Sequence, residues 1–191
     1  MIDNNYKFWL AGFVEGEGSL TISIIDHDKA THGILLQPEF NVSQHLNGLS
    51  ILESFKTLFN GKGQIHKKSG SKNVWVFTLK GINNLNDYII PFFMEFVVRY
   101  SSKYKNKEFE KFVFILRKLK ENSSPPTAGG SNVLPSTLLN KVEIKKSKFK
   151  KDEFIDLIKL IYTLNPDGKG KKRKRSLSEI LSIIEDKNSK N

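Results

Sequence analysis

The stretch from Trp9 to Ser19, which reads WLAGFVEGEGS, constrains the fold of this chain more than any other segment. Gly12 and Gly16 stand inside a run that is otherwise suited to a helix, although a helical glycine costs roughly 1 kcal/mol relative to alanine. Residues four apart share one helical face, so the two glycines, extended by Ala11, predict a thin stripe on which a second backbone can pack closely. Gly18 then ends the helix, because a strand-like run follows it.

Glu17 stands at the C-terminal end of this expected helix, where the macrodipole already carries partial negative charge. If two such helices pack through the glycine stripe, two carboxylates meet at the same end. At a separation of about 5 Å and an effective dielectric constant of about 20, they repel by roughly 3 kcal/mol, more than one surface interaction usually offsets. A divalent cation between them removes this repulsion. The stretch therefore predicts half of a metal site; the plainer interpretation is a chance glycine-rich helix end.

The net charge of the 191-residue chain is +11, with 31 Lys and Arg against 20 Asp and Glu. The length suits one domain with a real core, and 14 Phe with 38% hydrophobic residues argue against disorder. The excess positive charge predicts a polyanionic partner, with nucleic acid ahead of a membrane surface. The sequence has no cysteine, which excludes disulfides, cysteine-ligated zinc and thiol catalysis.

The most apolar run, Tyr88 to Val98, is too short to span a bilayer and is interrupted by Pro91 and Glu95. We therefore expect a soluble, intracellular protein with no membrane partner. Lys far outnumbers Arg and Asn is abundant, which favours an AT-rich genome such as that of an organelle, with a mitochondrion ahead of a chloroplast.

Alternating polar and apolar residues predict four strands, of which the last two form a hairpin around a Ser-Gly-Ser turn. Pro38 indicates an edge position or a bulge in the second strand. The strands are expected at residues 19–24, 36–44, 63–68 and 73–79.

Apolar residues at helical spacing predict the other elements of this core. Asn47 is expected to cap the helix after the second strand, and Pro91 is expected to end a short helix after the hairpin. The resulting order, α-β-β-α-β-β-α, predicts an α+β fold with one four-stranded antiparallel sheet covered by helices on one face. The helices are expected at residues 6–17, 47–59, 83–90 and 102–119.

Polar side chains alternate onto the face of the sheet that these helices leave uncovered. Such a face is most often simply solvated, but the positive charge of the chain and the adjacent carboxylate helix favour a nucleic-acid surface here. The residues expected on this face are Ser19, Thr21, Ser23, Gln37, Glu39, Asn41, Gln64, His66, Lys68, Asn73 and Trp75.

Residues 121–151 are irregular and rich in Ser, Pro and Gly, which predicts a linker or long loop with one short helix near 136–142. An amphipathic pattern at 152–164 predicts a further helix. Ser176-x-x-Glu179 predicts a capping box that opens the last one. We expect this helical extension, residues 152–191, to belong to the same domain as the core, residues 1–120.

A basic run occupies residues 168–175, between the last two expected helices. Such a run is most often a solvated tail or a nuclear localisation signal. The two flanking helices favour an ordered loop that grips phosphates without reading sequence. The residues expected to do so are Lys171, Lys172, Arg173, Lys174 and Arg175.

LAGFVEGEG, residues 10–18, closely resembles the signature of the LAGLIDADG homing endonucleases. The resemblance implies a motif helix at a two-fold interface and a saddle-shaped sheet that lies in the DNA major groove. It also implies that Glu17 and the carbonyl of Gly16 hold a catalytic divalent metal. Glutamate replaces the usual aspartate at Glu15 and Glu17, and glutamate remains a sound oxygen ligand. Glu15 is expected to be a helix-end or DNA-proximal carboxylate rather than a ligand.

The same resemblance implies two helpers near the reacting water. Gln44, at the end of FNVSQ, would orient the water, and Lys103, in SSKYKNKEF, would be the basic residue close to the metal. The plainer interpretations are a strand-end amide for Gln44 and a solvated helix lysine for Lys103.

One copy of the motif supplies one acidic helix, so we expect a homodimer that acts on a near-palindromic double-stranded DNA site. The dimer interface is expected at Ala11, Gly12 and Gly16. The implied function is an intron-encoded, site-specific DNA endonuclease that uses Mg²⁺, for which Mn²⁺ or Ca²⁺ can substitute in binding. Two alternatives remain: a maturase that binds its host intron RNA, and a DNA-binding protein of the same fold without cleavage.

Overall fold

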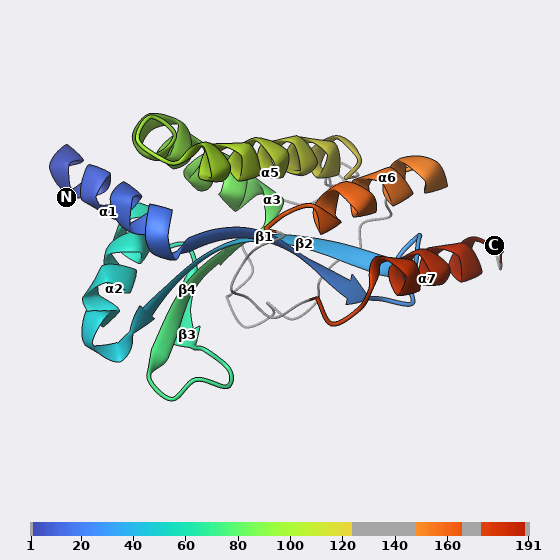
Figure 1. Cartoon of the computed structure of the whole chain (residues 1–191), viewed down its shortest axis with the longest axis horizontal. Coiled ribbons are helices and arrows are strands. Elements are labelled where there is room, and N and C mark those ends of the chain that lie inside the picture. The colour runs from blue at the N-terminus through green and yellow to red at the C-terminus, as the bar shows by residue number, and fades with distance from the viewer. Residues whose placement is uncertain (1, 124–147, 166–172, 190–191) are drawn as a thin grey trace, which may run out of the picture.

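A four-stranded antiparallel sheet, in the order β1-β2-β4-β3, organises the structure. The computed structural model describes residues 2–123, 148–165 and 173–189. Two long helices, α5 and α6, run along one face of the sheet, and the β3–β4 hairpin projects from the opposite side (Figure 1). The expected α+β fold with one antiparallel sheet is therefore confirmed. The strands are β1 (Gly18–Asp26), β2 (Ile34–His45), β3 (Gln64–Lys67) and β4 (Val74–Lys80).

Helix α1 (Asn4–Glu17) begins two residues earlier than the sequence predicts, because Asp3 caps it by accepting a hydrogen bond from the backbone N–H of Tyr6 at 2.8 Å. Leu10 and Val14 are fully buried, so packing on the core holds the helix together despite its glycines. The helix ends at Gly18 as expected. A side chain at Gly18 would bring its Cβ within 2.6 Å of Val14 Cγ1, so this close turn into β1 requires glycine.

Strands β1 and β2 pair without a bulge from Gly18 opposite Val42 to Asp26 opposite Ile34. Pro38 lies within this ladder, opposite Ile22. Strand β4 pairs with β2 only from Glu39 onward, so β1 is the only strand beside β2 at Pro38. At Pro38, β2 is therefore paired on one side only, and the missing N–H of the proline removes no hydrogen bond to β4.

A short 3₁₀ turn, η1 (Leu46–Gly48), separates β2 from helix α2 (Leu49–Leu58). The prediction that Asn47 caps this helix is wrong, since Gly48 holds the N-cap position. Asn47 instead donates its backbone N–H to Nδ1 of His45 at 3.3 Å, which caps the 3₁₀ turn.

Pro91 does not end a helix, contrary to the prediction from sequence. It lies in the first turn of a short α segment, where a missing N–H costs least, and π turns on both sides shift the hydrogen-bond register around it. The segments are α3 (Ile82–Asn84), η2 (Leu85–Ile89), α4 (Ile90–Phe92) and η3 (Phe93–Val97).

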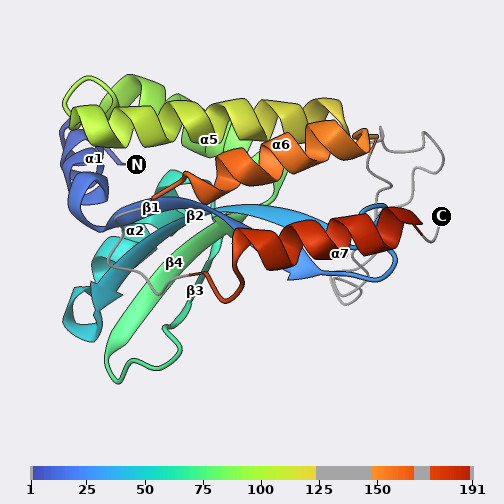
Figure 2. The same cartoon turned by 45° about the vertical axis from the view of Figure 1, so that its right-hand side comes forward.

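Helices α5 (Lys103–Glu121), α6 (Lys151–Tyr162) and α7 (Leu177–Ser189) complete the described fold. The capping box before α7 is confirmed: Ser176 N–H donates to Glu179 Oε2 at 2.6 Å, and Glu179 N–H donates to Ser176 Oγ at 3.3 Å. Figure 2 shows α5 and α6 side by side over the sheet, with α7 along the end of β1 and β2. The expected short helix at 136–142 lies outside the described residues.

Phenylalanine rings dominate the core between the sheet and its helices. Phe40, fully buried on β2, contacts the rings of Phe55, Phe59, Phe77 and Phe93 at centroid distances of 5.8–6.4 Å. The same hydrophobic cluster continues to buried residues of α6 and α7, so these C-terminal helices share the core of the sheet.

Phe40→Ala should lower the free energy of unfolding by about 3–5 kcal/mol, because it leaves a cavity among four rings. Phe114→Ala on α5 is the matched control, since that ring is 52% exposed and its loss should cost no more than about 0.5 kcal/mol. Urea denaturation of both variants measures the difference. Equal losses would contradict this description of the core.

Candidate catalytic site and nucleic-acid interface

Glu17 is the last residue of α1, and β1 begins directly after it. Its side chain is exposed and makes no hydrogen bond or ion pair to any described residue. The carbonyl of Gly16 lies in the same last turn, where helical carbonyls have no partner four residues on. Two hard oxygen donors are therefore free at one point next to the sheet, which suits a divalent cation such as Mg²⁺.

Lys105 fills the C-terminal end of α1 from the side of α5. Its ammonium group donates to the carbonyl of Gly18 at 2.7 Å and to that of Val14 at 3.2 Å. A cation at a helix C-terminus opposes the negative end of the dipole. Burial lowers the pKa of Lys105, and the negative charge of Glu15 partly opposes this shift by raising it. The structure thus places a partly desolvated lysine beside the acidic motif.

Lys103, which the family resemblance favoured as the basic residue near the metal, is exposed at the first turn of α5, and its side chain makes no hydrogen bond or ion pair to a described residue. Two residues along a helix are about 200° apart, so the two lysines face nearly opposite sides. Lys105 lies four residues before Phe109 and seven before Phe112, both of which are buried. This register with the apolar stripe of α5 is the signal in the sequence that Lys105, rather than Lys103, points toward the core side of α5.

Gln44 lies two residues beyond Val42, the strand partner of Gly18, and is therefore level with the end of α1. Its Oε1 accepts a hydrogen bond from the backbone N–H of His45 at 2.6 Å. A Cβ at Gly48 would lie 2.6 Å from Gln44 Cγ, so the glycine leaves room for this side chain. The local packing thus holds the Gln44 amide against the turn that follows β2.

Glu15 faces α5 rather than the free end of α1. Its Oε1 accepts a hydrogen bond from the backbone N–H of Ser102, the N-cap of α5, at 3.3 Å. Its Oε2 is buried and has no hydrogen-bond partner among the described residues.

The strand register places most of the predicted polar residues on one face of the sheet. Directly opposed residues in an antiparallel ladder lie on the same face of the sheet. Thr78 of β4 opposes both Asn41 of β2 and Gln64 of β3, so these three side chains share one face. Lys68 is exposed one residue beyond β3, and Asn73 is exposed just before β4, where its carbonyl accepts a hydrogen bond from Leu46. The opposed pairs are Ser19 with Asn41, Thr21 with Glu39, Ser23 with Gln37, and His66 with Val76.

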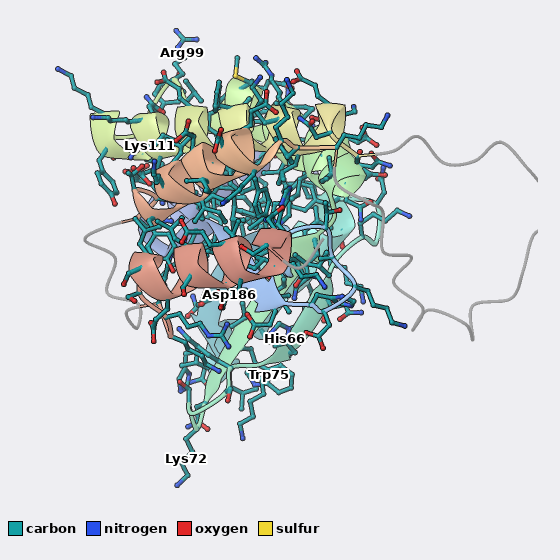
Figure 3. The ribbon with its side chains drawn as sticks, turned by 90° about the vertical axis from the view of Figure 1, so that its right-hand side faces the viewer. His66, Lys72, Trp75, Arg99, Lys111 and Asp186 are labelled. Atoms are coloured by element: carbon teal, nitrogen blue, oxygen red, sulfur yellow. The ribbon has the colours of Figure 1, made fainter. Side chains whose placement is uncertain are left out.

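Trp75 is wrongly predicted for this face. It opposes Gln44 and alternates with the fully buried Phe77, so it lies on the helix-covered side and packs against the core. Trp75 lies two and four residues before the buried Phe77 and Leu79, so the period of two places all three on the same, helix-covered face. Figure 3 shows His66 and Trp75 in the hairpin, with Lys72 beyond them at its tip.

A hydrogen-bond network connects the middle of the polar face. The carboxylate of Glu39 accepts from the hydroxyls of Thr21 and Ser23 at 3.4 and 3.2 Å and pairs with Lys80 at 3.2 Å. Asn41 continues the network, donating to Thr21 at 3.3 Å and accepting from Thr78 at 2.7 Å. Sequence analysis missed Thr78 and Lys80, although they alternate onto this face once the register of β4 is known.

Arg173, which was predicted to bind phosphate, instead forms hydrogen bonds within the protein. Its guanidinium donates to the carbonyls of Ile22 at 3.0 Å and Ile161 at 2.9 Å, and it lies 4.9 Å from the ring centroid of Tyr162. Arg175 forms an ion pair with Asp26. These contacts connect the segment before α7 to β1 and α6.

Lys174 is exposed between these two arginines, and it makes no contact with a described residue that would prevent it from meeting a phosphate. Lys171 and Lys172 lie outside the described residues. Of the described basic residues in this turn, only Lys174 therefore fits the predicted role.

The sequence profile of the family described as LAGLIDADG endonuclease matches residues 10–116, more than half of the chain. The chain therefore belongs to the LAGLIDADG endonuclease family. It is 40% identical to DNA endonuclease I-CeuI of Chlamydomonas moewusii over 119 residues, which are 60% of this chain and 52% of that protein. The chain thus spans about half the length of this relative.

Two solved structures share the fold. The intron-encoded homing endonuclease I-CeuI complexed with DNA matches with a TM-score of 0.74 and 24% identity, over 96% of this chain and 78% of that one. The archaeal intron-encoded homing endonuclease I-Vdi141I complexed with DNA matches with a TM-score of 0.74 and 24% identity, over 98% and 99% of the two chains. In the part of this chain that the structure describes, no helix is both long and apolar enough to cross a membrane.

Arg173→Met and Lys174→Met should have separable effects. Loss of Lys174 should weaken binding to all DNA sequences alike and make the slope of log K against log salt shallower by about one unit. Loss of Arg173 should lower thermal stability, because two carbonyls lose their donor. Binding titrations at several salt concentrations, with thermal melts, measure both. A stable Arg173→Met variant with a shallower salt slope would reverse the assignment.

Proposed function

We propose that this chain is a homing endonuclease that hydrolyses phosphodiesters at one long, near-palindromic double-stranded DNA site with a divalent metal. The observation that carries the proposal is the exposed Glu17 carboxylate at the end of α1, beside a hydrogen-bonding sheet face. Two proteins of the same fold are described as homing endonucleases complexed with DNA, which supports the same substrate here.

Glu17 and the carbonyl oxygen of Gly16 would hold the metal, which we propose to be Mg²⁺, with Mn²⁺ or Ca²⁺ able to replace it in binding. Among the described residues no group of three or more His, Cys, Asp or Glu side chains is placed to hold an ion. The remaining ligands would come from the Glu17 of a second copy, from water and from DNA phosphate. When bound, the ion supplies an activated water and stabilises the charge that develops on the phosphate.

Two side chains of this chain would assist the reaction. Gln44, fixed level with the end of α1, would orient the attacking water through its amide. Lys105 would take the role that the sequence assigned to Lys103, because its ammonium group lies against the last turn of α1. A cation there opposes the negative charge that builds up on the phosphate.

The second copy would pack on the open stripe of α1. Gly12 and Gly16 are exposed, and a Cβ added at either would meet no described atom within 4 Å. Ala11 does not extend this stripe as expected; it is only 4% exposed because it packs into the core of its own chain. A two-fold dimer through the stripe would bring both Glu17 residues together and would fit a near-palindromic site.

The polar sheet face would read base edges in the major groove, and Lys174 would contact phosphate beyond it. The C-terminal helices share the core of the sheet, so we infer that they belong to the same domain as residues 1–120. The AT-rich codon usage implied by the composition leads us to propose an organelle, a mitochondrion ahead of a chloroplast, as the compartment.

Glu17→Gln should abolish cleavage in Mg²⁺ while leaving specific DNA binding within about tenfold, because it removes a metal ligand and little else. Glu53→Gln is the matched control, since Glu53 is equally exposed but lies on α2. Plasmid cleavage and binding titrations in Ca²⁺ measure the two properties. Near-native cutting by the Glu17→Gln variant would refute the proposed ligand, and tight binding of intron RNA without any DNA cleavage by the native protein would favour a maturase.

Gly12→Leu should give a folded monomer that does not cut, because its side chain would separate the two α1 backbones without touching the core. Sedimentation gives the mass, and circular dichroism reports folding. A Gly12→Leu variant that sediments as a dimer and still cuts would place the interface elsewhere.

A further inference from the structure

A hollow of about 340 Å³ opens beside the glycine stripe, between α1 and η3. Its lining includes Phe8, Gly12 and Glu15 of α1, with Phe96 and Tyr100 from the other side. Phe8 meets both of these rings edge to face, at centroid distances of 5.0 Å and 5.8 Å. The hollow is thus a pocket with three aromatic rings in its lining and of a size that admits a ring, and it borders the face on which the second copy would pack.

Glu15, one of the residues that line this hollow, carries an unsatisfied acceptor below the surface. Glu15 Oε1 is bonded to the backbone of Ser102, but its Oε2 is buried and has no partner among the described residues. A buried carboxylate oxygen without a donor is costly, so the pocket is complementary to a group that is apolar in body and carries one N–H or O–H.

Trp9 has these two properties and lies on the same helix, on the other side of the stripe. Its side chain is 49% exposed. It is held between Tyr6, stacked at 5.5 Å, and Phe13, stacked at 5.7 Å, so its orientation is set in advance. The indole offers a large apolar surface and a single N–H that can only donate.

Two-fold symmetry brings Trp9 of one copy next to the pocket of the other copy. At 3.6 residues per turn, Phe8 and Trp9 project about 50° to either side of the line through Gly12 and Gly16. The two α1 helices must run parallel for both Glu17 residues to meet at one end. Rotation about an axis parallel to the helices then places the Trp9 side of each helix against the Phe8 side of the other, at the same height.

We propose that Trp9 of each copy inserts into the pocket beside Phe8 of the other copy, and that the Glu15 carboxylate turns toward the pocket so that Oε2 accepts the indole N–H. This inference rests on the proposed dimer through α1 and specifies how the two chains recognise each other. Each dimer contains the contact twice. An aromatic anchor in a desolvated pocket is the arrangement that most often dominates an interface.

Tryptophan fluorescence tests the insertion directly. The chain has two tryptophans, so Trp75→Phe leaves Trp9 as the only emitter. In the dimer, Trp9 emission should shift to shorter wavelength and acrylamide quenching should fall several-fold. Dilution of the Trp75→Phe protein to monomer, or addition of Gly12→Leu to it, should restore full acrylamide quenching of Trp9.

A mutant cycle tests the hydrogen bond. Trp9→Ala should raise the dimer dissociation constant about 30-fold or more, whereas Phe114→Ala, which removes a similarly exposed ring on α5, should raise it less than about threefold. Trp9→Phe and Glu15→Gln should each weaken the dimer, and the double variant should be no weaker than Trp9→Phe alone.

The outcomes separate this inference from the proposed function. A dimer in which Trp9 remains fully quenchable, or in which the Trp9→Phe and Glu15→Gln effects simply add, would overturn the insertion while leaving the dimer intact. A native protein that is monomeric at all concentrations and on its DNA target would overturn both.

Discussion

The contact between Lys105 and the end of α1 is the interaction on which the rest of the site depends. The ammonium group holds the carbonyls of Val14 and Gly18 at the negative end of α1, while Glu15 accepts from the first turn of α5 at its positive end. Thus α5 supplies a positive charge at the C-terminus of α1, and α1 supplies a negative charge at the N-terminus of α5. This reciprocal pair fixes the turn from helix to strand at Gly18, and with it the position of Glu17 relative to the sheet.

The same edge of β1 explains why the C-terminal helices matter to the sheet. β1 is an edge strand, and alternate carbonyls along it accept hydrogen bonds from side chains: Gly18 from Lys105, Leu20 from Asn165, and Ile22 from Arg173. An edge satisfied in this way is closed to pairing with another strand. Residues around α6 and α7 therefore support the strand that leads from the motif onto the polar face.

Local signals predicted the parts of the fold that depend on local physics. The alternation of β1 and β2, the Ser176 capping box and the Gly18 stop are each decided by a few neighbouring residues, and each was found from sequence. Pro91 was not, because π turns on both sides accommodate it. Trp75 was placed on the wrong face although it alternates with Phe77 and Leu79, which are both buried. For the candidate site, the sequence predicted that a helix ends at Glu17 and that a strand ends near Gln44, and the roles of both residues stay predictions. The contact of Lys105 with the end of α1 and the structural role of Arg173 depend on tertiary contacts that spacing alone does not contain.

The proposed metal site requires that two copies pack in parallel through the open stripe of α1, so that both Glu17 residues meet at one end. The chain has no cysteine, so a single introduced thiol reports on this packing without interference. Asn5 lies on the stripe seven residues before Gly12, whereas Lys7 lies on another side of the helix, over the ring of Phe96. With a short bismaleimide, Asn5→Cys should give a cross-linked dimer in high yield on uncleaved DNA, and Lys7→Cys should give little. Absence of cross-linking at Asn5→Cys, or equal cross-linking at both positions, would contradict the account.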